Sequence, residues 1–322
     1  MADSRNKPST EPVLQAVAAC LFRYAKARDS VVVGLSGGLD STVLLHAASC
    51  LAGAADLQLS ALHVHHGLNI NADVWADSCA HICQVLNIPL TVLRVDVPLS
   101  TGEGPEAAAR RVRHKALADQ SAKWILLAHH ADDQAETILH NLLRGAGVRG
   151  AAAMPESRGR VLRPLLGLAR DELLAYARAR RLVWIEDDSN ADRRYTRNFL
   201  RHEILPLIAS RFSKASEQLA AAAGRFGEAA SLLDDLASVD LGGCRPEFPL
   251  PLTLFRNLPE PCARNLLRAM LTWHQVQPPD ARRLTEFVRQ LHTAGTDRHP
   301  RIDLGPYSLW CEAGRLCFKL SD

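Results

Sequence analysis

The stretch Val31-Val-Val-Gly-Leu-Ser-Gly-Gly-Leu-Asp-Ser-Thr42 decides the fold of this chain. It joins a short run of β-branched residues to the turn Ser36-Gly-Gly-Leu-Asp-Ser41, and a helical pattern follows at once from Ser41 to Ala52. The backbone N–H groups of such a turn converge on an anion, together with the positive end of the helix dipole. Glycines let the backbone approach that anion closely. The stretch therefore predicts a strand, a phosphate-binding turn and a helix.

The acid in this turn separates it from the common nucleotide-binding loop. The pattern GxxxxGK[ST] needs a Lys before its last hydroxyl, and Asp40 stands there instead. A carboxylate beside a triphosphate requires a divalent cation between them, so Asp40 is predicted to bind Mg²⁺. The turn resembles the PP-loop of the ATP pyrophosphatase superfamily, which splits ATP into AMP and pyrophosphate. The predicted ATP-binding residues of the turn are Ser36, Gly37, Gly38, Leu39, Asp40 and Ser41.

Apolar strand patterns alternate with amphipathic helices over the first half of the chain. The predicted strands are 30–35, 57–65, 89–95, 124–128 and 161–166, and the predicted helices are 13–24, 41–52, 71–86, 106–121, 132–144 and 170–181. This alternation is typical of an α/β fold with a doubly wound, mostly parallel, Rossmann-like sheet. Ligands bind such sheets beyond the carboxyl ends of the strands. The segments Ser36–Ser41, His63–Gly67 and His129–Asp133 all lie at strand ends, and we expect them to meet there.

A chain of 322 residues is long for one hydrophobic core and predicts more than one domain. We expect an ATP-binding catalytic domain over 1–211, a connector helix over 212–241, and a smaller α-rich domain over 242–322. The segment Gly145–Gly159 is rich in Gly, Ala, Pro and Ser, and is predicted to be a mobile loop.

A concentration of acids follows the predicted strand 124–128, in the string His129-His-Ala-Asp-Asp-Gln-Ala-Glu-Thr137. Asp132 or Asp133 is expected to cap the next helix, with Glu136 as a capping-box partner. Three carboxylates and two histidines exceed what a cap needs. Such a group can bind a second cation, or hold the ammonium of an amine substrate and take its proton. Asp132, Asp133 and Glu136 are therefore predicted catalytic residues.

Positive charge is concentrated in one region. The net charge is only +3, but residues 144–211 hold 14 Arg and no Lys against 8 Asp and Glu, a local excess of six positive charges. This excess favours a polyanionic substrate such as RNA. Arg194, Arg197 and Arg201 are spaced to contact a phosphate backbone; ion pairs with the acidic loop 186–192 are the alternative. Arg110 is predicted to bind a phosphate or a substrate carboxylate.

Together these motifs resemble the tRNA(Ile)-lysidine synthetase family of PP-loop enzymes over roughly residues 30–205. The matching strings are Ser36–Ser41, His63–Leu68, Pro105–Arg110, His129–Thr137, Arg144-Gly145, Glu186–Asn190, Tyr195, Arg197-Asn198 and Arg201. The resemblance implies that ATP adenylates the C2 oxygen of the wobble cytidine in an isoleucine tRNA with a CAU anticodon. The amine of free L-lysine then attacks C2 and expels AMP.

The resemblance also assigns roles to single residues. The backbone near His63 and His65 contacts adenine, and Asp40 holds Mg²⁺ opposite the α-phosphate. Asp132, Asp133 and Glu136 match the acids that bind and activate lysine, and the choice of general base among them stays open. Some family members carry two domains after the connector helix, whereas this sequence has room for one.

Other classes of protein remain as alternatives. A PP-loop tRNA thiolase usually needs paired cysteines, and the eight cysteines here form no CxxC pair. A glutamine-dependent synthetase needs a glutaminase, and a non-catalytic nucleotide- or RNA-binding module would not need the acids. No signal peptide and no long apolar run occur, which predicts a cytoplasmic protein without membrane contact. The oligomeric state stays open, with a homodimer as one alternative.

Overall fold

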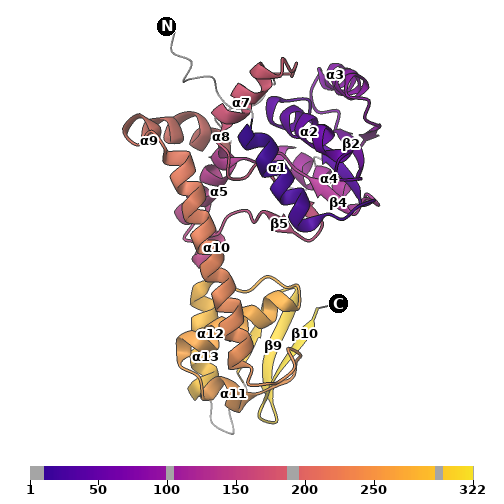
Figure 1. The fold of residues 1–322 in the computed structure, drawn as a ribbon. Helices are drawn as coiled ribbons and strands as arrows, with labels where there is room; N and C mark the ends of the chain where they lie inside the picture. Colours follow the sequence, from indigo (N-terminus) through magenta and orange to yellow (C-terminus); the bar gives the residue numbers. More distant parts are fainter. Residues whose placement is uncertain (1–10, 99–104, 187–195, 294–299, 322) are drawn as a thin grey trace. The chain divides into compact units, whose positions relative to one another are not determined.

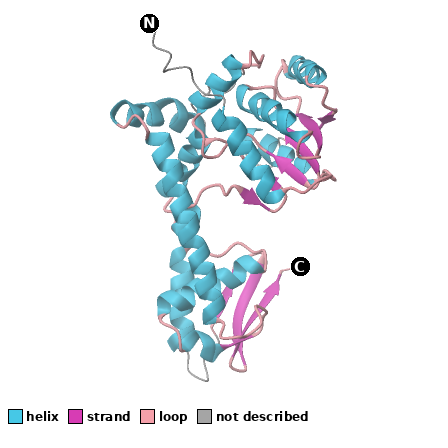
Figure 2. Ribbon diagram, in the orientation of Figure 1, coloured by secondary structure: helices cyan, strands magenta, loops and turns pink. Residues whose placement is uncertain are grey.

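The computed structural model describes residues 11–98, 105–186, 196–293 and 300–321. The chain divides into two compact units, 1–227 and 228–322. The boundary between the units falls inside a helix of 26 residues, α10 (Ala215–Asp240). Figure 1 follows the elements along the chain, and Figure 2 distinguishes helices from strands. The functional division predicted at residues 211 and 241 stays a prediction.

The first unit is built on a six-stranded sheet in the order β3-β2-β1-β4-β6-β5. Its strands are β1 (Ser30–Gly34), β2 (Gln58–His65), β3 (Leu90–Arg94), β4 (Trp124–Leu126), β5 (Ser157–Arg158) and β6 (Val161–Leu162). All neighbouring pairs are parallel except β5–β6, at the edge. The predicted doubly wound, mostly parallel sheet is confirmed. The chain winds outward from β1 to β3 and then returns to place β4 on the other side of β1, which makes the β1–β4 boundary the switch point where such folds bind ligands.

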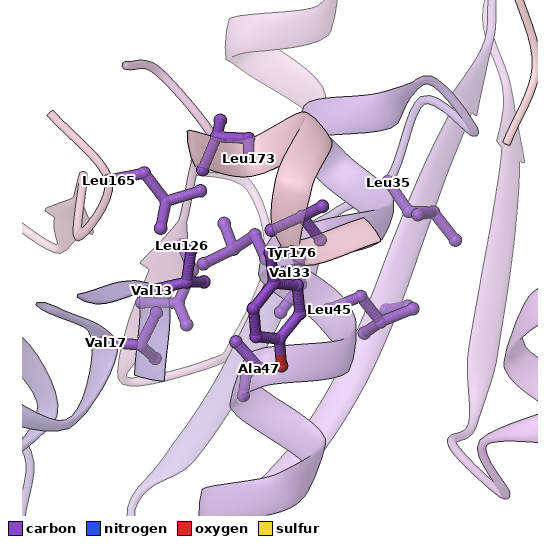
Figure 3. Close-up of a cluster of buried hydrophobic side chains, with 14 of the residues drawn as sticks. Val13, Val17, Val33, Leu35, Leu45, Ala47, Leu126, Leu165, Leu173 and Tyr176 are labelled. Atoms are coloured by element: carbon purple, nitrogen blue, oxygen red, sulfur yellow. The ribbon is translucent and has the colours of Figure 1, made fainter. Parts of the chain in front are cut away.

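Alternating valines of β1 build a core on each face of the sheet. Val31 and Val33 pack with residues of α1 (Glu11–Tyr24), α2 (Leu39–Ala52), α3 (Ala72–Val85) and α7 (Arg170–Ala179). Val32 faces the other way and packs with Leu117 of α4 (Pro105–Ala118). Figure 3 shows part of the first core, with Tyr176 of α7 beside Val33 and Leu45. Because side chains of a strand point alternately to opposite faces, this apolar run requires helices on both sides.

The segment Gly145–Gly159 is hydrogen-bonded to α5 (Ala131–Leu143), the helix that precedes it, whereas its composition predicted a mobile loop. The buried Gln134 amide donates to the Met154 carbonyl at 2.7 Å and accepts from the Met154 N–H at 2.9 Å. Asn141 donates to the Gly150 carbonyl at 2.8 Å. The segment also forms a short helix, α6 (Val148–Ala151). Side-chain amides of α5 therefore supply the order that the glycine-rich sequence lacks.

Residues 196–211 form three consecutive helical pieces. These are α8 (Thr196–Phe199), the π-helical segment η2 (Leu200–Ile204) and α9 (Leu205–Arg211). A π-helical turn adds a residue per turn, changes which side chains face the neighbouring element and is frequent at functional sites. Arg201 lies in this π-helical segment.

The second unit combines the end of α10 and further helices with an antiparallel sheet. The helices after α10 are α11 (Leu252–Arg256), α12 (Glu260–Trp273) and α13 (Ala281–Thr293). The sheet has the order β7-β10-β9-β8, formed by β7 (Leu250–Pro251), β8 (Arg301–Asp303), β9 (Tyr307–Glu312) and β10 (Arg315–Leu320). The sequence predicted a smaller α-rich domain here, and the elements β7 and α11 are too short to show a period. In the described part of the chain, no helix combines the length and apolarity that crossing a membrane requires.

Candidate active site

The turn after β1 is closed by its own hydroxyl groups. The Ser36 N–H donates to Ser41 Oγ at 3.2 Å, and the two serine hydroxyl oxygens lie 3.0 Å apart. Ser41 Oγ also donates to the Gly38 carbonyl at 3.1 Å. The Leu39 side chain is buried in the core, so that residue faces the turn with its backbone alone. The turn ends at the first residue of α2, where uncapped N–H groups suit an anion.

Gly37 occupies a position that admits no side chain without strain. Its φ is +85°, and a Cβ there would lie 2.7 Å from Cδ1 of Ile185, whose N–H donates to the Gly37 carbonyl at 2.9 Å. We expect Gly37→Ala to lower the free energy of unfolding by roughly 1–3 kcal/mol and to reduce ATP binding. Chemical denaturation and ATP titration measure the two effects.

Two variants control this prediction. Gly53→Ala should not lower stability, because Gly53 has φ −64° and open space around its Cβ position. The double variant Gly37→Ala/Ile185→Ala should recover only part of the loss, since it removes the contact but leaves the strained φ. Wild-type stability in the single Gly37→Ala variant would contradict this account of the turn.

The two histidines of β2 have different surroundings. His63 is buried, and its Nδ1 lies 2.9 Å from the Leu35 carbonyl and 3.4 Å from the Cys79 thiol. His63 therefore supports the turn through its contact with Leu35, the residue before the turn. His65 is also buried, but its Nε2 lies 3.2 Å from a carboxylate oxygen of Asp73 in α3. Its side chain is thus engaged away from the turn, and the predicted contact between the His63–His65 backbone and adenine stays a prediction.

The N-cap residue of α5 is His130, whereas the sequence predicted an aspartate at this position. The Asp132 N–H donates to His130 Nδ1 at 3.3 Å, and the His130 N–H donates to Asp133 Oδ2 at 3.1 Å. The reciprocal pair of a capping box is therefore His130 with Asp133. Glu136 takes no part in the cap and is left for another role. The string offers His130 and, two residues later, Asp132 as N-cap candidates, and sequence preference favours the aspartate.

His130 links this helix to the turn after β1. Its buried ring places Nε2 3.5 Å from Asp40 Oδ2 and 3.5 Å from Asp133 Oδ2, while Nδ1 is 3.4 Å from Asp132 Oδ2. Burial alone would lower the pKa of His130, but the surrounding carboxylates outweigh it and raise this pKa to about 10. A protonated ring has no lone pair to accept the Asp132 N–H, so protonation exchanges the helix cap for ion pairs. In both forms the imidazole joins Asp40 to α5.

Glu136 and Asp133 share one cation from the π-helical segment. Arg201 donates from Nη2 to Asp133 Oδ1 at 2.9 Å and from Nε to Glu136 Oε1. Glu136 is only 2% exposed. Burial raises the pKa of Glu136, which Arg201 opposes and Asp133 reinforces. Burial acts in the same direction on Asp133, but the charges of His130 and Arg201 outweigh it and lower the pKa of Asp133. The two carboxylates therefore differ: the pKa of Asp133 is lowered, whereas the pKa of Glu136 is raised.

Asp132 points to a neighbouring helix start. Its Oδ2 accepts the Arg170 N–H at 3.0 Å, at the N-terminus of α7, where the N-cap Ala169 offers no side-chain acceptor. Burial would raise the pKa of Asp132, but hydrogen bonds from His130, Ser216 and the Arg170 N–H lower it well below its usual range. This carboxylate joins α5 to α7.

A basic group borders these acids on the side of β6. Arg163, the residue after β6, is 8% exposed, donates from Nη1 to the Pro155 carbonyl at 2.9 Å, and has a buried Nε without an acceptor in the described part of the chain. Burial lowers the pKa of His129 to about 3; Asp133 opposes this, and the charges of Arg163, Arg110 and Arg197 reinforce it. His129 is thus a neutral ring, and its buried Nδ1 has no hydrogen-bond partner among the described residues.

Sequence reasoning missed Arg163 and assigned no specific role to His129 or His130. The predicted strand 161–166 placed Arg163 inside a strand, whereas β6 ends at Leu162 and Arg163 follows it at the ligand-binding edge of the sheet. Arg110, predicted from α4, belongs to the same basic surroundings through its effect on His129.

The residues present are compatible with a magnesium ion beside a bound nucleotide. Asp40 Oδ1 is buried and accepts no hydrogen bond from any residue that the structure describes. A carboxylate oxygen with free lone pairs is the ligand that Mg²⁺ prefers, and this ion typically takes one or two carboxylates, with waters and phosphates completing its shell. The described residues hold no cluster of three or more His, Cys, Asp and Glu arranged for a metal. Asp40 thus fits a magnesium ion held largely by the nucleotide.

The three arginines predicted to contact RNA have different outcomes. Arg194 lies outside the described residues. Arg197 donates from Nη2 to Thr137 Oγ1 of α5 at 2.9 Å. Arg201 forms ion pairs with Asp133 and Glu136 of α5, and the alternative, ion pairs with the acidic loop, falls on residues that mostly lie outside the described part of the chain. Contacts of these residues with RNA stay predictions.

Comparison with known proteins gives two matching family models. Residues 10–208 match the PP-loop domain, and residues 250–317 match the TilS substrate binding domain. Among solved structures, a tRNA thiolase, NcsA from Methanococcus maripaludis, superposes with a TM-score of 0.58 at 17% identity, covering 67% of this chain and 78% of that one. This similarity concerns the fold alone.

Curated relatives carry the name tRNA(Ile)-lysidine synthase. The protein of Nitrosomonas europaea is 38% identical over 100% of this chain and 72% of its own length. That of Pseudomonas aeruginosa is 45% identical over 90% of this chain and 69% of its own. That of Alkalilimnicola ehrlichii is 46% identical over 83% of this chain, which spans 62% of that relative.

Proposed function

The chain belongs to the tRNA(Ile)-lysidine synthase family, and we propose that it ligates lysine to C2 of the wobble cytidine in an isoleucine tRNA with a CAU anticodon. Such an enzyme is an ATP-dependent C–N ligase that yields lysidine, AMP and pyrophosphate. The observation that carries the proposal is the His130 ring, which lies 3.5 Å from Asp40 of the phosphate-binding turn and 3.5 Å from Asp133 of the acidic cluster. The proposal assigns cleavage of the ATP anhydride to the turn and handling of the lysine amine to the acidic cluster, which His130 joins at the switch point of the sheet.

In the first step, the C2 oxygen of cytidine attacks the α-phosphorus of ATP and pyrophosphate leaves. The turn Ser36–Ser41 supports this step, since its N–H groups and the N-terminus of α2 attract the departing pyrophosphate. Bound at Asp40, Mg²⁺ would neutralise charge that develops on the phosphate oxygens. Adenylation converts the C2 oxygen, a poor leaving group, into part of AMP, which is a better one.

In the second step, the lysine ε-amine attacks C2, the bond to the AMP oxygen breaks, and one proton leaves the nitrogen. An alkylammonium has a pKa of about 10.4, so the amine must lose a proton before it can attack. Asp133, held as an anion, suits the ammonium form. Glu136, whose pKa is raised, suits the role of proton acceptor.

The other end of lysine carries a carboxylate, and the basic group beside the acids fits it. Among the described residues, neither the buried Nε of Arg163 nor the buried Nδ1 of His129 has a hydrogen-bond partner. Arg110 contributes charge to the same surroundings. We place the lysine carboxylate against Arg163, His129 and Arg110, with the side chain directed to Glu136. The opposite signs of the two groups orient the substrate, because either reversed end would meet like charge.

RNA binding is supported by the basic region 144–211. We expect Arg197→Ala to weaken the affinity for tRNA and to reduce the slope of log Kd against log salt by about one. Titration of labelled tRNA at several salt concentrations measures both. Arg178→Ala, which removes an exposed arginine from α7, serves as the control. An unchanged slope for Arg197→Ala would show that Arg197 makes no contact with the RNA phosphates and serves only the contact with Thr137.

Incorporation of radioactive lysine into tRNA tests the proposal directly. The purified chain, ATP and Mg²⁺ should label the CAU isoleucine tRNA and leave methionine tRNA, which shares the anticodon, unlabelled. The reaction brings together tRNA, ATP and free lysine, which places it in the cytoplasm. Absence of lysine incorporation would overturn the proposal. Sulfur transfer to tRNA would favour a thiolase instead, although burial raises the pKa of Cys79 to about 12 and that of Cys83 to about 11, which leaves these thiols poor nucleophiles.

A further inference from the structure

A largely apolar pocket of about 500 Å³ lies where α9 and α10 meet, within the first unit. We call it the α9–α10 pocket. Its apolar walls are Leu139 of α5, Ile208 of α9, Phe212 between the helices and Leu219 of α10. Arg211 and Lys214 stand at its border. The volume falls within the range of sites for small organic groups.

Phe212 is the unusual member of this pocket. Its side chain is 65% exposed, although a large apolar surface of this kind normally turns inward. A ring presented at the rim of an apolar pocket is the arrangement on which nucleic-acid bases stack. The neighbouring cations agree with such a ligand. Arg211 and Lys214 are exposed, and neither forms an ion pair within the described part of the chain.

The pocket is adjacent to the acidic cluster. Leu139 follows Glu136 by three residues on α5, which corresponds to about 4.5 Å along the helix axis. In the first turn of α10, Ser216 directly follows the pocket residue Ala215 and shares a hydrogen bond with Asp132. A nucleotide in the pocket would therefore lie beside a nucleotide that reaches the reacting acids.

We propose that the α9–α10 pocket binds the base of an unpaired nucleotide next to the target cytidine, with Arg211 and Lys214 contacting its phosphate. This inference rests on the proposed function and adds a determinant of RNA recognition to it. The ring of Phe212 stacks on the base. Arg211 and Lys214, which form no ion pair among the described residues, neutralise the charge of the phosphate. A protein partner that filled the pocket with an apolar side chain would leave both cations without counter-charge, so the charge favours RNA.

Steady-state lysine incorporation with Phe212→Ala tests the proposal. We expect the KM for CAU isoleucine tRNA to rise about tenfold or more, since loss of one base–aromatic stack has effects of that size. The kcat at saturating tRNA should stay within twofold of wild type, because Phe212 does not touch the reacting groups. Phe212→Trp should retain the wild-type KM. Circular dichroism checks that the variants fold.

Matched variants separate stacking from general surface effects. Leu207→Ala removes a 69% exposed apolar side chain of α9 that lies outside the pocket, and this variant should leave the KM unchanged. Lys214→Ala should reduce the salt dependence of tRNA binding, whereas Lys26→Ala, an exposed lysine beyond α1, should not.

The outcomes are distinguishable. An active wild-type chain whose Phe212→Ala variant keeps its KM overturns the inference alone. If the variant keeps its KM but loses a concentration-dependent increase in mass seen for wild type, the pocket is a contact between copies of the chain and the inference is again overturned. A wild-type chain that incorporates no lysine overturns the proposed function, and this inference with it.

Discussion

Replacement of Asp40 by Ala is expected to reduce ATP-dependent pyrophosphate release by about 10³-fold or more. Asp40 Oδ1, at the start of α2, is a buried carboxylate oxygen that accepts no hydrogen bond from the described residues. Its Oδ2 lies 3.5 Å from His130 Nε2. The variant removes the acid that fits a cation and one of the links between the turn and α5. Pyrophosphate release with CAU isoleucine tRNA and saturating ATP measures the adenylation step without requiring lysine.

Three further variants separate the two roles of Asp40. Asp40→Asn keeps the shape and should raise the Mg²⁺ concentration needed for half-maximal release. His130→Gln removes the link to α5 and should leave that concentration unchanged. Asp77→Ala, which removes an exposed acid from α3, should behave as wild type. Pyrophosphate release by Asp40→Ala within tenfold of wild type would show that Asp40 is dispensable for adenylation.

Glu136→Gln is expected to slow the lysine step by about 10²–10³-fold while pyrophosphate release falls less than tenfold. The amide is the same size as the buried carboxylate but cannot accept a proton. Arg201 keeps Asp133 as its partner in the variant, so the fold of the site should persist. Rapid quenching after ATP addition separates the two steps, and the adenylated tRNA should accumulate before lysine is consumed.

The control for this substitution is Glu217→Gln, at an exposed acid in the first turn of α10. It should leave both steps at the wild-type rate. Glu136→Ala should behave like Glu136→Gln in the lysine step, since both remove the proton acceptor. Equal losses in adenylation and lysine transfer would mean that Glu136 supports the site as a whole and is not the base. A similar partition in Asp133→Asn instead would move that role to Asp133.

Much of the first unit follows from local patterns. The β-branched run before Ser36 and the helical period after Ser41 predicted β1 and α2 nearly to the residue. The alternation of strands and helices predicted the parallel sheet, because successive parallel strands require crossover helices. Local patterns failed where short elements or side-chain amides supply the order, as in β7, α11 and the segment that Gln134 and Asn141 hold against α5.

The acidic string shows what local rules leave undecided. Sequence preference placed an aspartate at the α5 cap and Glu136 in its capping box, whereas His130 and Asp133 form it. Asp132 then serves the N-terminus of α7, a partner 38 residues away that periodicity cannot identify. The three carboxylates of the acidic string therefore have three different environments, although they lie within five positions of one another in the sequence.

The sequence by itself determined that this chain has a phosphate-binding turn with an acid, an acidic helix start after a later strand, and a sheet to carry both. These are properties of neighbouring residues, set by backbone geometry and side-chain period. Only the tertiary structure decided which acids face which cations. His130 meets Asp40 and Arg201 meets Glu136 because β4 lies beside β1 and the π-helical segment packs against α5. Charges 65 to 90 positions apart interact through space, and the distances that set their pKa values exist only once the chain has folded.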